Sequence, residues 1–149
     1  YSGGSLFAGL FGSQQIVSVA MGQIGNSGGQ KFWSWYGFDS HVSWCACFVS
    51  WCANECGYLD TGVIPRFASC SIGLQWFRER GLWRDHSYEP RPGDLIFFVG
   101  TYDTPGVSHV GIYVGGGKML HCGDPIQYAD INTSYWQSHF YAFGRPPYN

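Results

Sequence analysis

The sequence predicts an α+β fold in which helices come first along the chain and antiparallel strands follow. Apolar residues recur at helical spacing in the segments 14–24, 44–56 and 69–80, which indicates helices. Beyond residue 94 the apolar residues form a short continuous run and then an alternating one, which indicates strands. We therefore expect one domain whose helices pack against an antiparallel sheet.

Residues 1–13 differ from the rest of the chain because they are rich in glycine and serine, as linkers are. We assign them as a linker and residues 14–149 as the domain. The 149 residues are the length of one domain, and a hydrophobic share of 45% is enough to build its core. The chain has no initial methionine and no basic leader, so we expect a further segment upstream in the full-length protein.

The first predicted helix covers residues 14–23. Ser13 is its expected N-cap, and Gly25 its end. The residues expected to face the core are Ile16, Val17, Ala20 and Ile24. The stretch 26–42 combines glycines with aromatic residues, and we predict that it is a loop lining a cleft.

A second predicted helix places a thiol in its first turn. Ser43 is the expected N-cap, the helix covers residues 44–56, and Gly57 follows as the left-handed end residue. Cys45 lies where the free N–H groups and the helix dipole favour the thiolate over the thiol. The other cysteines of this helix lie deeper and lack that help; they are Cys47, Cys52 and Cys56. Cys45 is therefore the candidate nucleophile.

The elements that follow are a third helix and the first strands. The helix is predicted for residues 69–80, with Gly81 as its end. Its core-facing residues are Ile72, Trp76 and Phe77. Residues 91–94 are typical of a turn, in which the Asp94 side chain caps the backbone. Residues 95–99 then form a buried strand, and residues 139–143 form a last one.

Residues 108–121 are typical of a hairpin that carries two histidines. Apolar residues alternate along them, and three consecutive glycines supply the turn. His109 opens the first strand and His121 lies in the returning one, so a turn near Gly116 brings them opposite or nearly opposite one another. Such a pair can serve a thiol, because one imidazole takes the proton while the other fixes the first ring's orientation.

The six cysteines are interpreted as free thiols. Four of them share one helix, where pairs seldom reach disulfide geometry, and buried free cysteine packs as a small hydrophobe. The alternative is a zinc site made of the cysteine cluster together with His121 and Cys122. Its spacing lacks the paired C-x-x-C of structural zinc sites.

The composition argues against two classes of partner. The formal charge is −2, and lysine and arginine form no cluster, so we expect no nucleic acid. No apolar run reaches the roughly 18 residues that a membrane span requires. We expect a monomer that does not cross a membrane.

Three motifs occur in a set order: Trp-Cys-Ala-x-Phe-Val-Ser-Trp-Cys at 44–52, Arg-Pro-Gly-Asp-Leu-Ile-Phe-Phe at 91–98, and His-Val-Gly-Ile-Tyr-Val at 109–114. Together, over residues 14–146, they resemble the NlpC and CHAP superfamily of papain-like cysteine peptidases and amidases of the bacterial cell wall. The resemblance implies a papain-like fold with the nucleophile helix packed on an antiparallel β-sheet. It implies Cys45 as nucleophile, His109 as general base and His121 as the third polar residue. Asp124 and Asn132 are the alternatives for the third residue.

The resemblance also points to residues around the nucleophile. Tyr36 is similar to the active-site tyrosine that NlpC members carry ahead of the cysteine, so we expect an oxyanion donor there, together with the N–H of Cys45. Trp44 stands where the NlpC branch usually has aspartate. We expect Trp44 and Asp39 to line the cleft.

The implied function is hydrolysis of peptidoglycan peptides through a thioester, without metal or cofactor, at the bond between D-glutamate and the diamino acid. Three alternatives use the same fold: a CHAP-type N-acetylmuramoyl-L-alanine amidase, an acyltransferase, and a wall-binding module without turnover. The implied location is extracellular or at the cell wall, with a wall-active or wall-binding domain upstream.

Overall fold

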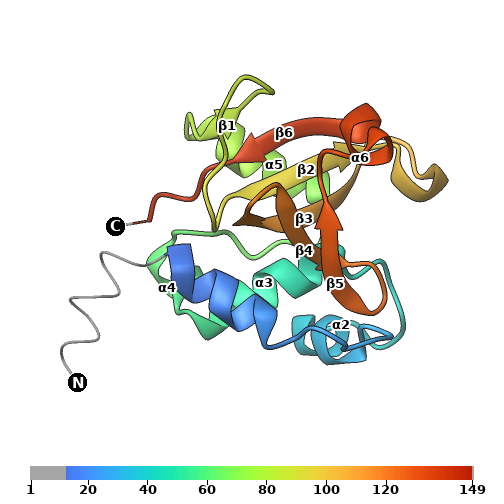
Figure 1. Cartoon of the computed structure of the whole chain (residues 1–149). Coiled ribbons are helices and arrows are strands. Elements are labelled where there is room, and N and C mark those ends of the chain that lie inside the picture. Colours follow the sequence, from blue (N-terminus) through green and yellow to red (C-terminus); the bar gives the residue numbers. More distant parts are fainter. Residues whose placement is uncertain (1–12, 149) are drawn as a thin grey trace.

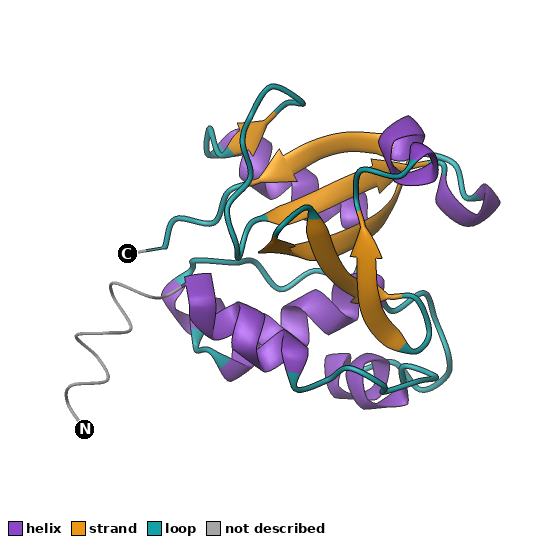
Figure 2. Ribbon diagram, viewed as in Figure 1, coloured by secondary structure: helices purple, strands orange, loops and turns teal. Residues whose placement is uncertain are grey.

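The computed structural model, which describes residues 13–148, consists of a six-stranded antiparallel sheet with helices packed against it (Figures 1 and 2). The expected α+β class is confirmed. The strands, in the spatial order β1-β6-β2-β3-β4-β5, are β1 (Trp83–Arg84), β2 (Leu95–Val99), β3 (Val107–Gly115), β4 (Lys118–Cys122), β5 (Ile126–Asp130) and β6 (Phe140–Gly144). The helices are α2 (Gln30–Tyr36), α3 (Cys45–Glu55), α4 (Tyr58–Thr61), α5 (Cys70–Glu79) and α6 (Ser134–His139), with a 3-10 helix at Thr101–Asp103 and a first helix at 13–21.

The start of the described chain corrects two expectations. Residues 1–12 of the predicted linker lie outside the described residues, and Ser13, assigned to the linker, is already helical. Ile16 and Ala20 are buried as predicted. Ile24 is 44% exposed, because the helix ends at residue 21 and Ile24 falls in the turn after it. The predicted core face is therefore right over the helix and wrong beyond its end.

The predicted hairpin is confirmed, since β3 and β4 pair through a two-residue turn. Gly115 pairs with Lys118, and Gly116 and Gly117 between them have φ of 62° and 75°. A two-residue turn of type I′ has positive φ at both central positions, which glycine adopts without strain. The glycines thus fix the register of the strands that carry the two histidines.

Both faces of the sheet are covered, which explains the continuous apolar run in β2. Leu95 and Phe97 belong to the main core between the sheet and α3 and α5, whereas Ile96 and Phe98 belong to a second cluster that includes Trp136 of α6. Figure 1 shows α3 lying along the sheet beside β3 and β4, while α6 lies at its far end. The sheet is therefore a central layer that positions residues on both sides.

Three expectations about the helices are wrong in detail. The stretch 26–42, predicted as a loop, contains α2. Helix α3 begins at Cys45 with Trp44, not Ser43, at its N-cap, so Ser43 lies outside the helix. Ser69 does cap α5, its hydroxyl accepting from the N–H of Ile72, but Ile72 itself is 68% exposed. Phe77 is buried in the main core and Trp76 packs against it, as predicted, and Leu74 joins them from the same helix.

Helix α2 is held by packing more than by its own short sequence. Phe32 is fully buried, stacks on Trp44 with ring centroids 5.7 Å apart, and meets Phe48 edge-on at 5.2 Å. Gly29, at the N-cap of α2, lies against the same indole, because a Cβ there would come within 2.3 Å of Trp44. Helix α2 thereby fixes the residue that precedes Cys45.

None of the described helices is both long enough and apolar enough to cross a membrane.

Candidate active site

The start of α3 presents Cys45 to the sheet. Cys45 is the first residue of the helix, is 5% exposed, and lies 3.9 Å from the carbonyl oxygen of Ser108 in β3. The first intrahelical bond runs from the N–H of Phe48 to the carbonyl of Trp44, and the Trp44 side chain makes no capping hydrogen bond. The N–H groups of the first turn and the positive end of the helix dipole therefore lie beside the sulfur.

The hairpin brings the two predicted histidines into contact. His109 Nε2 lies 2.9 Å from His121 Nδ1, and the two residues are 2% and 4% exposed. A His109 nitrogen and Cys45 Sγ lie within 4.8 Å of one another, and because Nε2 is engaged with His121, we assign Nδ1 to the thiol. The structure thus arranges sulfur, imidazole and imidazole in the order expected of an activated nucleophile.

Trp136 encloses the histidine pair and was not foreseen from the sequence. Its ring stacks on His109 at 5.4 Å and 26°, and meets His121 edge-on at 5.2 Å. The indole comes from α6, whose N-cap Thr133 accepts a hydrogen bond from the Trp136 N–H of the backbone. A Thr-x-x-Trp start to a short helix was the available signal. Trp136 removes water from the imidazoles and restricts their rotation.

Burial keeps His121 neutral. Desolvation, helped by the neighbouring His109, lowers the pKa of His121 to about 3. Nδ1 of a neutral His121 can accept a hydrogen bond. We therefore assign the hydrogen between the two rings to His109 Nε2, which donates it. That assignment leaves His109 Nδ1 free to accept a proton from Cys45.

Three thiols from three elements meet at the nucleophile. Cys45 Sγ lies 3.5 Å from Cys70 Sγ at the start of α5, and Cys122 at the end of β4 lies within 4.8 Å. Hydrogen bonds from Cys122 and Cys70, with a further contribution from His109, lower the pKa of Cys45 well below its ordinary value, although burial acts in the opposite direction. The same contacts raise the pKa of Cys70 and Cys122.

The remaining cysteines are poor nucleophiles. Burial raises the pKa of Cys47 and of Cys56 to about 11, and it also raises that of Cys52 well above its ordinary value. All six cysteines are free thiols in the structure. Cys45 alone among them has a lowered pKa.

Among the described residues, the group that could hold a metal shares two cysteines with the zinc alternative but takes a different histidine. The ligand atoms of Cys45, His109 and Cys122 lie within 4.8 Å of one another, a donor set that suits zinc. His121, the histidine named in the zinc alternative, has its Nδ1 against His109 instead.

The sulfur and His109 border a cavity of about 430 Å³. Its lining residues are His41, Ser43, Trp44, Cys45, Tyr102, Thr104, Ser108, His109, Cys122, Gly123 and Asp124. Trp44 is where the sequence predicted it. Tyr36 and Asp39 are not among the lining residues: Tyr36 ends α2 beneath the Arg66 guanidinium, at 4.0 Å, and Asp39 is an exposed residue after it. The oxyanion role of Tyr36 stays a prediction.

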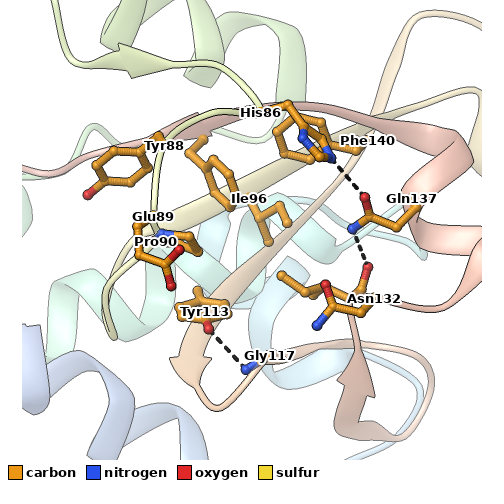
Figure 3. Close-up of a pocket in the computed structure, with 12 residues that line it drawn as sticks. His86, Tyr88, Glu89, Pro90, Ile96, Tyr113, Gly117, Asn132, Gln137 and Phe140 are labelled. Atoms are coloured by element: carbon orange, nitrogen blue, oxygen red, sulfur yellow. Dashed lines mark hydrogen bonds between the residues drawn. The ribbon is translucent and has the colours of Figure 1, made fainter.

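The alternatives for the third polar residue have other partners than His109. Asp124 lines the cavity, but its carboxylate accepts from the Gly28 N–H at 2.7 Å. Asn132 lines a second cavity of about 290 Å³, shown in Figure 3, whose lining includes His86 but no cysteine. His86 is engaged there with Gln137 at 2.8 Å. Of the three candidates, His121 is the one hydrogen-bonded to His109.

Residues 29–145, most of the chain and all of the elements just described from α2 to β6, match the model of the NlpC/P60 family. The chain belongs to the NlpC/P60 family. The expectation from the sequence motifs is confirmed on this point.

Curated relatives of this NlpC/P60 chain are longer enzymes. The bifunctional muramidase/DL-endopeptidase CwlT of Bacillus subtilis is 33% identical over 137 residues, covering 90% of this chain and 38% of its own length. The probable endopeptidase p60 of Listeria monocytogenes is 33% identical over 102 residues, covering 64% of this chain and 20% of its own. The chain thus spans well under half of these relatives.

A solved structure shares the NlpC/P60 fold. A protein described as similar to lipoprotein, of the NLP/P60 family, from Staphylococcus aureus superposes with a TM-score of 0.61 at 29% identity. The match covers 92% of this chain and 42% of that one. The papain-like arrangement expected from the motifs, with the nucleophile helix on an antiparallel sheet, is the arrangement observed.

Proposed function

We propose that this chain is a peptidoglycan hydrolase that cleaves peptide bonds through the thiolate of Cys45. One observation carries the proposal: the only cysteine with a lowered pKa lies at a helix start, on a cavity, beside a histidine pair whose nitrogens are 2.9 Å apart. Membership of the NlpC/P60 family supports the same chemistry.

The reaction follows from the positions of these groups. Cys45 Sγ attacks the carbonyl carbon, and the first-turn N–H of Cys45 donates to the developing oxyanion. His109, carrying the proton taken from the thiol, gives it to the leaving amine. His109 then accepts a proton from water, which hydrolyses the thioester. His121 is a positioning residue that holds the His109 ring with its Nδ1 toward the sulfur.

The proposed substrate is a stem peptide of peptidoglycan, cut between D-glutamate and the diamino acid. The relative CwlT is named a DL-endopeptidase, and a bond between residues of opposite chirality is typical of peptidoglycan stems. We place the enzyme outside the cell or at the wall, where this substrate lies, and propose that the full-length protein carries a further wall-active or wall-binding domain.

Product analysis tests this proposal. The purified chain is incubated with peptidoglycan whose stem peptides contain a known diamino acid, and the released fragments are identified by mass spectrometry. We expect fragments with a new amino terminus on the diamino acid, and none with the matched variant Cys45→Ala. A new amino terminus on L-alanine would show an amidase instead. No release, or equal release by Cys45→Ala, would refute the proposed nucleophile.

A further inference from the structure

Cys70 helps to lower the pKa of Cys45, but it takes no step in the hydrolysis just described. Cys70 Sγ lies 3.5 Å from Cys45 Sγ, yet Cys70 is buried and is not among the residues that line the cavity. A substrate in the cavity therefore meets Cys45 but not Cys70. Cys122, in contrast, lines the cavity with the nucleophile.

We propose that Cys45 and Cys70 form a site of reversible oxidation, at which a peroxide converts the two thiols into a disulfide that inactivates the hydrolase until a thiol or phosphine reduces it. The inference rests on the proposed function of Cys45, because only a catalytic sulfur makes the bond regulatory. It assigns to Cys70 the role of the resolving thiol.

The chemistry balances with hydrogen peroxide as the oxidant. The Cys45 thiolate attacks one peroxide oxygen, an S–O bond forms, the O–O bond breaks, and the departing hydroxide takes a proton to become water. The Cys70 sulfur then attacks the sulfenic sulfur of Cys45, an S–S bond forms, and the S–O bond breaks. The hydroxyl leaves with the proton of Cys70 as a second water. Two electrons pass from the sulfurs to the peroxide.

The local structure allows the two sulfurs to close. They must move from 3.5 Å to the disulfide distance of about 2.05 Å. Each cysteine is the first residue of its helix, α3 or α5, and each follows an irregular segment, at 38–44 and at 62–69. Because the packing of Trp44 holds the start of α3, the shift falls to Cys70, and the segment before α5 absorbs it without breaking a hydrogen bond in a helix interior.

The pairing with Cys70 also protects Cys45 from irreversible oxidation. A sulfenic acid without a neighbouring thiol is oxidised further to sulfinic acid, which ordinary reductants do not reverse. Cys70, in contact with Cys45, captures the sulfenic acid first. The expected signature of the site is that oxidation inactivates the native chain reversibly but inactivates a chain without Cys70 permanently.

The experiment uses the reduced chain, treated with hydrogen peroxide and then divided, one half receiving a phosphine reductant. Free thiols are alkylated, intact masses are measured, and cysteine peptides are mapped. We expect the loss of two hydrogens, a cross-linked peptide joining Cys45 to Cys70, and a fall in peptidoglycan hydrolysis of at least about tenfold that reduction reverses. The absence of a cross-link, or a cross-link from Cys45 to Cys122, would overturn the proposal.

Two variants complete the test, each compared with its own activity before oxidation. Cys70→Ala should gain oxygen at Cys45 and fail to recover with phosphine, whereas the matched control Cys122→Ala should recover as the native chain does. Recovery of Cys70→Ala would contradict the resolving role. Cys70→Ser, which keeps the size of the side chain, serves the same purpose should Cys70→Ala not fold.

The readouts separate this inference from the proposed function. Mass and peptide mapping need no turnover, so a Cys45–Cys70 cross-link in a chain that never hydrolysed peptidoglycan would refute the hydrolase and leave the thiol pair standing. Hydrolysis that persists through peroxide treatment, with no cross-link, would refute the thiol pair alone.

Discussion

Cys45 differs from its neighbours on the same helix in the groups that surround its sulfur. Cys47 and Cys52 are buried among apolar side chains, and burial raises their pKa. Cys45 is equally enclosed, but thiol donors and an imidazole lower its pKa despite burial. The groups around the sulfur therefore decide whether a cysteine of this helix is a structural or a reactive thiol.

The variant Cys45→Ala should lose activity by at least about 1000-fold, because removal of a nucleophile leaves only binding and oxyanion stabilisation. The matched control Cys47→Ala removes a buried thiol whose pKa is raised to about 11. We expect it to keep activity within about threefold of the native chain. Release of muropeptides per folded chain, with folding checked by circular dichroism, measures both. Equal activity of the two variants would contradict the assignment.

At the scale of elements, α2 and the loop before α3 set the position of the nucleophile. Trp44 is clamped between Phe32 and Gly29, and it connects α2 to the first residue of α3. Because α2 buries few residues, this clamp is a small contact with a direct effect on the site.

The variant Gly29→Ala tests this clamp. Gly28 and Gly29 both have positive φ, 81° and 74°, so alanine at either position costs roughly 1 to 2 kcal/mol. A Cβ at Gly29 also meets the Trp44 indole at 2.3 Å, whereas nothing lies within 4 Å of one at Gly28. We expect Gly29→Ala to cost about 1 to 3 kcal/mol more than the control Gly28→Ala in urea unfolding, and to reduce hydrolysis as well. Equal costs for the two variants would contradict the clamp.

Elements with a local signal could be predicted from the sequence, and elements that depend on distant packing could not. The glycine turn fixes the register of β3 and β4, so His109 and His121 were expected to be near one another. Helix α2 was missed because its stretch is rich in glycine and aromatic residues and its helix depends on the packing of Phe32. The approach of Cys70 and the cover provided by Trp136 join elements far apart in sequence. A local pattern such as Thr-x-x-Trp signals the start of a helix, but not what the indole covers.

On the scale of the whole molecule, the helices supply the nucleophile and the sheet supplies the imidazoles. The site therefore exists only when both layers are packed together. Trp136 covers the histidine pair, and both histidines are buried. The fold consequently keeps His121 neutral, and the free energy of unfolding falls when the solution becomes acidic.

The stability of the chain should depend on pH through His121. Its pKa is about 3 in the folded chain and near 6.5 when unfolded, so between these values the unfolded chain binds the extra proton. Stability is complete above pH 6.5 and is lost as pH falls toward 3, by up to about 1.4 kcal/mol per pH unit. The variant His121→Gln lacks this titration. The free energy of unfolding, measured in urea between pH 4 and 6, should change less steeply with pH in this variant than in the native chain, by the equivalent of about one proton. Equal slopes for the two chains would contradict the buried neutral histidine.

The rate at which each thiol is alkylated tests the central claim, that the sulfur of Cys45 is ionised at a helix start beside an imidazole. The reduced chain is treated with iodoacetamide at neutral pH, and labelling of the six cysteine peptides is followed by mass spectrometry together with hydrolytic activity. We expect Cys45 to be labelled first, and activity to be lost in step with it. Even labelling of all six thiols, or loss of activity in step with another cysteine, would contradict the account.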